Sequence, residues 1–276
     1  MKCTVDIFEL EGGRRQAEYF GSRPLWLSYS ALKNLWTCPA KYALANVLRL
    51  VPKTVDTRNF CLGSVGHACL ERWVKEGNLS PGYMASIAQA EFDDNITKNV
   101  VIPLHKHDIY QMRAKAVVNA QAIEDTMTAY GLADKTLVSE GYLKVPLPGS
   151  DSAMLVGIVD LRVIEDGSIY DLKVTKNATF MDRDQLCIYC MMGEIAGYGS
   201  GRAGFIVPLR KERVVTMNFG ESDYLAMLDR IHEAMDTIEN GLDTGQWEAN
   251  PGCSDCYWCG VAGLCAANRQ LRYVEQ

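Results

Sequence analysis

The chain has 276 residues, 48% of them hydrophobic, which is enough for one large domain or for a core domain with a helical addition. No apolar run reaches the roughly 18–20 residues needed to cross a bilayer, and acids interrupt the N-terminal segment where a signal peptide needs an apolar core. We therefore expect a cytoplasmic protein without a membrane partner, and its net charge of −6 argues against a generally basic nucleic-acid coat.

The spacing of apolar residues is helical in the first part of the chain and becomes strand-like near residue 137. Apolar residues recur at helical spacing and then alternate or run together as in strands, with Gly and Pro between them. The helical patterns cover 28–37, 39–50, a segment from Ser64, 82–99 and 108–130. Strand patterns cover 137–147, 153–164, 168–175, 203–208 and 213–219, with helices at 184–196 and 222–241 and an irregular tail from Asn250.

This order predicts an α/β fold with a central mixed β-sheet flanked by helices. We expect residues 1–276 to form a single domain with three parts. These are a helical N-terminal part (28–130), a core (137–220) and a C-terminal helix with a cysteine-rich tail (221–276).

Residues 157–173 read GIVDLRVIEDGSIYDLK, which predicts two antiparallel strands joined by a tight turn. The turn would bring Asp160 beside Asp171, and strand alternation places Lys173 on the same face as Asp171. Two carboxylates and an amine can hold a hard divalent cation and a water molecule. The alternative is a surface hairpin with a salt bridge.

Three further groups are candidates for the same site. His67 and Glu71 lie four residues apart on one helix, where Gly63 and Gly66 would permit close approach of a neighbour. Gln185 and Tyr189 have the same spacing and could bind phosphate or order Lys173, although a capping glutamine and a core tyrosine are the alternative. Glu140 could supply another carboxylate or simply end a strand in solvent. His67 could equally be a packing residue.

The tail carries Cys253, Cys256, Cys259 and Cys265, a spacing that lets several thiolates reach one metal or cluster. All four could close a zinc site by themselves. Alternatively, Cys38 replaces Cys253 as a distant fourth ligand. Ten cysteines in a reducing compartment indicate metal ligands more than disulfides.

Basic residues gather in two short runs, 31–60 and 202–213. The second contains Arg202, Arg210, Lys211 and Arg213 against Glu212. Such runs can follow a phosphate backbone, but solvated surfaces explain them about as often.

The ordered set His67, Asp160, Asp171-Leu172-Lys173 and Gln185-x3-Tyr189 resembles the RecB-like branch of the PD-(D/E)XK nucleases. Cys38 with Cys256, Cys259 and Cys265 is similar to the iron–sulfur subset of that branch, which includes CRISPR-associated adaptation exonucleases and AddB-type helicase-nucleases. The matches span 38–265. Asp171 stands where the family often has Glu, and Cys253 is an additional cysteine.

The resemblance implies a restriction-endonuclease-like core over 137–220 and a Mg²⁺- or Mn²⁺-dependent DNA exonuclease. His67, Asp160, Asp171 and the Leu172 carbonyl would bind the metal, and Lys173, Gln185 and Tyr189 would complete the catalytic set. Cys38, Cys256, Cys259 and Cys265 would bind a [4Fe-4S] cluster.

No G-x4-GK[ST] helicase motif occurs, so a stand-alone nuclease fits best, viral or from a CRISPR or recombination system. Its partners would be DNA ends or single strands, with a homo-oligomer or a partner protein also open. A non-catalytic DNA-end-binding or partner-docking module and a zinc-stabilised interaction protein remain as alternatives.

Overall fold

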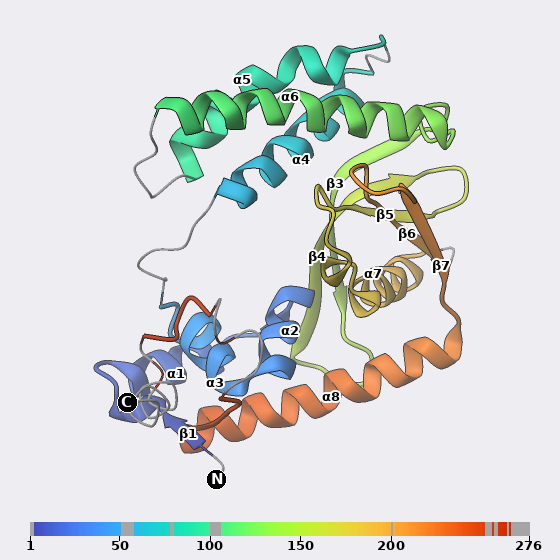
Figure 1. Ribbon diagram of the computed structural model, residues 1–276. Coiled ribbons are helices and arrows are strands. Elements are labelled where there is room, and N and C mark those ends of the chain that lie inside the picture. Colours follow the sequence, from blue (N-terminus) through green and yellow to red (C-terminus); the bar gives the residue numbers. More distant parts are fainter. Residues whose placement is uncertain are drawn as a thin grey trace. The chain divides into compact units, whose positions relative to one another are not determined.

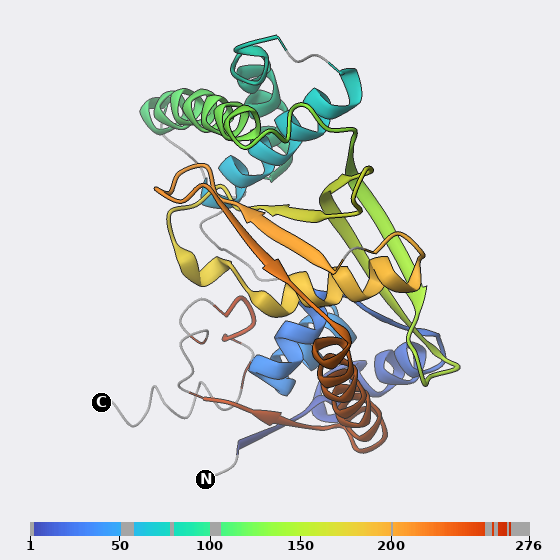
Figure 2. The same ribbon diagram turned by 90° about the vertical axis from the view of Figure 1, so that its right-hand side faces the viewer.

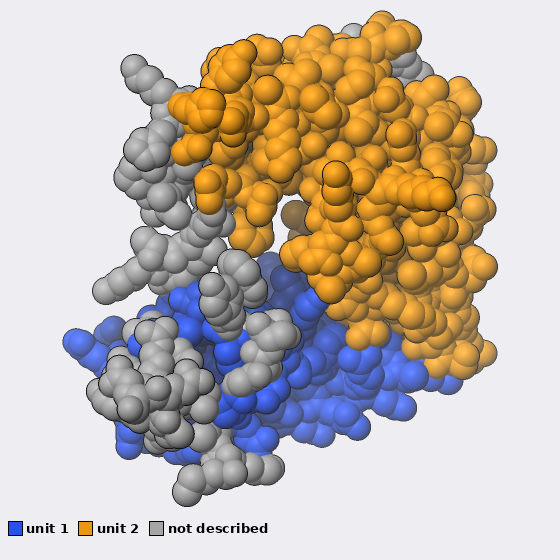
Figure 3. Space-filling model, in the orientation of Figure 1, with its two compact units in different colours: residues 1–55, 146–156, 225–276 blue, residues 56–145, 157–224 orange. Residues whose placement is uncertain are grey.

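The computed structural model describes residues 3–50, 58–77, 80–99, 106–199, 201–251, 256, 259–263 and 265. Backbone contacts divide the chain into two compact units, and neither unit is one continuous segment. Unit 1 comprises Met1–Val55, Pro146–Val156 and Leu225–Gln276, and unit 2 comprises Asp56–Val145 and Gly157–Tyr224 (Figure 3). The first, middle and last parts of the sequence therefore fold together in unit 1.

Unit 1 joins strands that lie far apart in the sequence. Strand β1 (Cys3–Asp6) pairs antiparallel with β8 (Gln246–Ala249), with Val5 opposite Trp247. The buried Trp247 ring packs on Tyr42, their ring centroids 5.8 Å apart. The unit also contains η1 (Ile7–Glu9), α1 (Gly13–Gly21), β2 (Leu25–Leu27), α2 (Tyr29–Thr37), α3 (Pro39–Tyr42), the π-helical turn η2 (Ala43–Val47) and most of α8 (Glu221–Thr244).

Three helices of unit 2 pack side by side: α4 (Arg58–Glu76), α5 (Tyr83–Asn99) and α6 (Lys106–Ala129) (Figure 1). Their apolar side chains share one core with strand residues such as Leu161 and Tyr170. Glu124 of α6 is buried and accepts hydrogen bonds from the backbone N–H groups of Gly82 and of Met84, the latter at 2.8 Å. Because the first N–H groups of a helix lack partners within it, this carboxylate caps α5.

The sheet of unit 2 contains β4 (Ala153–Val163), β5 (Ile169–Leu172), β6 (Arg202–Ile206) and β7 (Val214–Asn218) in that order, and β3 (Leu137–Pro146) also pairs with β4. Strands β5 and β6 are parallel, whereas β4–β5 and β6–β7 are antiparallel. In unit 1, the first residues of β4 pair in parallel with β2.

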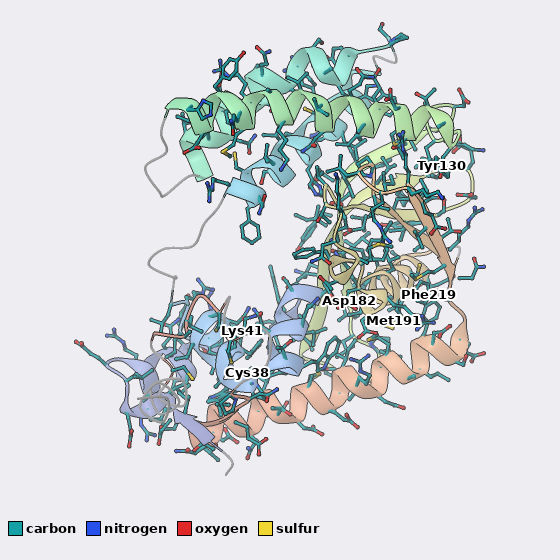
Figure 4. The ribbon with its side chains drawn as sticks, in the orientation of Figure 1. Cys38, Lys41, Tyr130, Asp182, Met191 and Phe219 are labelled. Atoms are coloured by element: carbon teal, nitrogen blue, oxygen red, sulfur yellow. The ribbon has the colours of Figure 1, made fainter. Side chains whose placement is uncertain are left out.

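Parallel strands need a crossover connection, and η3 (Ala178–Phe180) followed by α7 (Arg183–Ile195) supplies it between β5 and β6. Helix α7 begins after the N-cap Asp182 and packs on β5 and β6 (Figures 2 and 4). The expected mixed sheet flanked by helices is confirmed.

Three helix boundaries differ from expectation. The helix expected over 39–50 is only α3 and the π-helical turn, after which Arg49 adopts φ 54°. The helix expected from Ser64 begins earlier, at Arg58. The last helix does not end at Gly241: it continues to Thr244, and Gly245 at φ 76° ends it.

Gly241 has a packing role instead. A Cβ atom there would lie 2.5 Å from a ring carbon of Trp247.

Among the residues described, none of the helices combines the length and apolarity that a membrane span needs.

Candidate active site

The turn between β4 and β5 brings the two acids of the hairpin together. Leu161 pairs with Tyr170, so the next antiparallel position places Asp160 opposite Asp171. The backbone N–H of Leu172 donates a hydrogen bond of 2.7 Å to Asp160 Oδ2. This bond fixes one Asp160 oxygen and leaves Oδ1 directed elsewhere.

Asp171 is buried between an amide and an ammonium group. Gln185 Nε2 donates to Asp171 Oδ1 at 2.6 Å, and Lys173 Nζ lies 2.7 Å from Oδ2. Lys173 and Asp171 form an ion pair, and Oδ2 has no further hydrogen-bond donor among the described residues. A buried carboxylate oxygen in this state suits a cation.

A histidine and a third acid complete the cluster. His67 Nδ1 lies 3.2 Å from Asp160 Oδ1 and 3.9 Å from Glu140 Oε1. One ligand atom from each of these three residues lies within 4.8 Å of the others. Neighbouring ligands at about 2.1 Å from an octahedral ion are about 3 Å apart, so the group fits one small divalent ion. Asp171 is not part of this three-residue group.

The backbone of Glu140 directs its carboxylate to this site. Glu140 lies inside β3 yet has φ 49°, a left-handed conformation that few non-glycine residues adopt in a strand. Local departures of this kind re-aim side chains beside active sites. The sequence leaves Glu140 open between a further carboxylate for the site and a solvated strand end.

Glu71, expected on the same helix face as His67, forms an ion pair with Lys75. Its charge still contributes to raising the pKa of Glu140.

The acids shift one another's protonation. Burial, then the nearby Asp160 charge, raise the pKa of Asp171 to about 6, against the opposing effect of Lys173. Burial also raises the pKa of Glu140, with a further contribution from Asp160. Burial lowers the pKa of His67, but its hydrogen bond to Asp160 and the surrounding carboxylates outweigh this and raise it. The cluster therefore carries an excess of negative charge that a divalent ion would neutralise.

Helix α4 reaches the site because Gly66 lacks a side chain. A Cβ atom on Gly66 would lie 2.6 Å from Val174 Cγ2, in the residue directly after Lys173. The expected close approach is therefore found at Gly66. It is not found at Gly63, where an added Cβ would meet nothing within 4 Å.

Gln185 and Tyr189 act on the acids from α7. Besides holding Asp171, Gln185 Nε2 lies 3.4 Å from the Tyr189 hydroxyl. Tyr189 is buried, and burial raises its pKa to about 12, so it is a neutral hydrogen-bonding group. Gly157 makes room for its ring, since a Cβ there would be 2.9 Å from Tyr189 Cε1.

The four candidate cluster cysteines, Cys38, Cys256, Cys259 and Cys265, belong to unit 1. Cys38 caps α3 beside Lys41 (Figure 4). The backbone N–H of Asn250 donates to Cys38 Sγ at 3.4 Å, and the Cys256 thiol donates to the Asn250 carbonyl at 3.5 Å. Burial raises the pKa of the Cys259 thiol; nearby Lys41 lowers it and nearby Cys38 raises it. Asn250 thus contacts both Cys38 and Cys256 of the tail.

Cys38, Cys256, Cys259 and Cys265 form no disulfide bonds. No three of these four described sulfur atoms lie within 4.8 Å of one another. Thiolates at 2.3 Å from a tetrahedral zinc ion would be about 3.8 Å apart, so the group is wider than a closed zinc site. Cys253 lies outside the described residues, and the choice of fourth ligand stays open.

Comparison with known proteins identifies the family. The sequence model of the PD-(D/E)XK nuclease superfamily matches residues 26–266 of this chain. The crystal structure of a candidate exonuclease from Eubacterium rectale has the same fold, with a TM-score of 0.53, 12% identity, and coverage of 86% of this chain and 89% of that chain. The crystal structure of SSO0001 aligns over 92% of this chain and 94% of that chain at 9% identity, with a TM-score of only 0.38. A search among curated proteins found no match. Because the family match covers most of its length, this chain belongs to the PD-(D/E)XK nuclease superfamily.

Proposed function

We propose that the protein is a Mg²⁺- or Mn²⁺-dependent DNA exonuclease of the RecB-like branch. The observation that carries the proposal is the convergence of His67, Glu140 and Asp160 beside the buried Asp171–Lys173 pair. His67, Asp160, Asp171 and the Leu172 carbonyl would hold the metal, and Glu140 is placed to join them. When bound, a divalent ion lowers the pKa of water and neutralises charge on the scissile phosphate.

The protein's own groups supply orientation and charge. The Lys173 ammonium would hold the attacking water or stabilise negative charge as the water oxygen bonds to phosphorus and the leaving oxygen departs. Gln185 keeps Asp171 in place through its 2.6 Å hydrogen bond, and Tyr189 supports Gln185. Gln185 thus acts on a metal-ligating acid, whereas the sequence suggested contact with phosphate or Lys173.

The test is digestion of end-labelled single- and double-stranded DNA with and without Mn²⁺. Asp160→Asn keeps an oxygen for the Leu172 N–H but removes the charge, and Lys173→Gln removes the ammonium. Each should slow cleavage about 100-fold or more. Lys135→Gln, an exposed lysine before β3, is the matched control. Wild-type rates in either site variant would refute the assignment.

We also propose that Cys38, Cys256, Cys259 and Cys265 bind a [4Fe-4S] cluster that ties the tail to the α2–α3 corner. Support comes from the four cysteines, none of which forms a disulfide bond, and from the contacts of Cys38 and Cys256 with Asn250. Anaerobic purification should give a brown protein with iron and acid-labile sulfide, lost in Cys38→Ser. A colourless protein holding one zinc ion, retained by Cys38→Ser, would favour the site with Cys253.

For the biological setting we propose DNA processing in recombination or CRISPR adaptation, with DNA ends as substrate. Cysteines that form no disulfide bonds are compatible with a reducing cytoplasm. The same proposal includes that the protein acts as a homo-oligomer or together with a partner protein of recombination or CRISPR adaptation.

A further inference from the structure

Two connections leave the sheet at the edge where Asp171 and Lys173 lie, which is formed by the carboxyl ends of β5 and β6. Strands β5 and β6 are parallel with Leu172 opposite Ile206, so their carboxyl ends share one edge. The Lys173 N–H donates to the Ile206 carbonyl at 2.8 Å. The connection from Lys173 to α7 and the β6–β7 turn therefore start side by side, next to the proposed metal site.

The basic run of 202–213 is divided by this geometry. Arg202 is the first residue of β6, so one strand length, about 13 Å, separates it from the carboxyl edge. Arg210, Lys211 and Arg213 belong to the turn, which the Val207 N–H closes on the Arg213 carbonyl at 2.8 Å. Only these three cations of the run lie at the edge that carries Lys173.

The other connection contributes an exposed aromatic ring. Residues 176–180 are all exposed, and Phe180 has 55% of its surface accessible. The next residue, Met181, contacts the β6–β7 turn through its sulfur, 2.7 Å from an Arg210 guanidinium nitrogen. This contact places Phe180 beside the cationic turn.

We propose that Phe180, Arg210 and Lys211 receive a single-stranded DNA end next to the metal site, an inference that rests on the proposed nuclease function. Cations that follow the backbone and an aromatic face on which a base stacks are the two elements of single-strand binding. Inside a duplex the bases are stacked on one another, and a side-chain ring can stack between neighbouring bases only where the strand is unpaired. The arrangement therefore favours frayed or single-stranded ends.

The test is fluorescence anisotropy with a labelled short single strand and the matching blunt duplex, in buffer without divalent ions so that no cleavage occurs. Phe180→Ala should weaken single-strand binding about 5- to 150-fold and leave duplex binding unchanged, while Phe180→Trp retains binding. Arg210→Gln and Lys211→Gln should each reduce the slope of log affinity against log salt by about 0.7. Arg202→Gln is the matched control and should keep the wild-type slope.

Two results would overturn this inference: unchanged or equally reduced binding of both DNA forms by Phe180→Ala, or a slope change in Arg202→Gln equal to that in Arg210→Gln. Binding is measured without cleavage. A wild-type protein that binds single strands as described but cuts no DNA with Mn²⁺ would refute the nuclease function, and only the single-strand binding surface would remain.

Discussion

Alanine substitutions of Gly63 and Gly66 in α4 allow the effect of helix propensity on stability to be measured apart from the effect of packing. Ala is favoured over Gly inside a helix by about 1 kcal/mol, so Gly63→Ala, with open space around it, should stabilise the protein by up to that amount. At Gly66 the new Cβ would meet Val174 Cγ2 at 2.6 Å and Ile123 Cδ1 at 3.1 Å. Carbon atoms prefer about 3.5–4.0 Å, so helix and strand end must separate by about 1 Å.

Such overpacking costs about 1–3 kcal/mol, which offsets the helix gain and leaves Gly66→Ala between neutral and about 2 kcal/mol less stable. The larger effect falls on the next residue, His67, whose Nδ1 is 3.2 Å from Asp160 Oδ1. A displacement of about 1 Å is a large error for a metal ligand, since ligand distances are defined to about 0.2 Å. We expect Mn²⁺ affinity to fall in Gly66→Ala and to be unchanged in Gly63→Ala.

Isothermal titration with Mn²⁺ and urea unfolding measure the two effects separately. The double variant Gly66→Ala with Val174→Ala removes the clashing methyl groups and should recover Mn²⁺ affinity relative to Val174→Ala alone, as a double-mutant cycle shows. Equal Mn²⁺ affinity in Gly66→Ala and Gly63→Ala would refute the reasoning that Gly66 positions the histidine.

Two further predictions concern buried carboxylates. Because the folded state raises the pKa of Asp171 to about 6, ionising it costs stability as pH rises from 4 towards 7, so Asp171→Asn should melt higher than metal-free wild type at neutral pH and lose this advantage near pH 4. Thermal melts at both pH values test this, and equal melting temperatures at neutral pH would contradict it. Glu124→Gln keeps one acceptor for the two N–H groups at the start of α5 and should cost about 1–3 kcal/mol in urea unfolding, without changing Mn²⁺ affinity.

The hairpin was predictable because its signals are local. Alternation, the Asp-Gly turn and the acid positions all lie within residues 157–173, and the ladder follows them. Glu140 was harder, because its place in the site depends on a left-handed backbone that no residue pattern specifies. Gly241 looked like a helix end because glycine serves both as a terminator and as a point of close packing, and only the Trp247 contact distinguishes the two.

Features that depend on the pairing of strands far apart in the sequence are not predictable from local residue patterns. Strands β1 and β8 are each four residues long, so their alternation of apolar and polar residues is too short to identify a strand in the sequence. The basic run likewise read as one patch, because separating Arg202 from Arg210 requires the direction and register of β6.

The pairing of β1 with β8 has a consequence for synthesis on the ribosome. Unit 2 has all its residues once position 224 has left the exit tunnel, whereas unit 1 still lacks the partner of its first strand until residue 249 emerges. An N-terminal segment with an exposed strand edge and hydrophobic helices must therefore wait through most of translation, a period in which chaperone protection matters. Premature termination within α8 would yield a product with a complete unit 2 and a permanently incomplete unit 1.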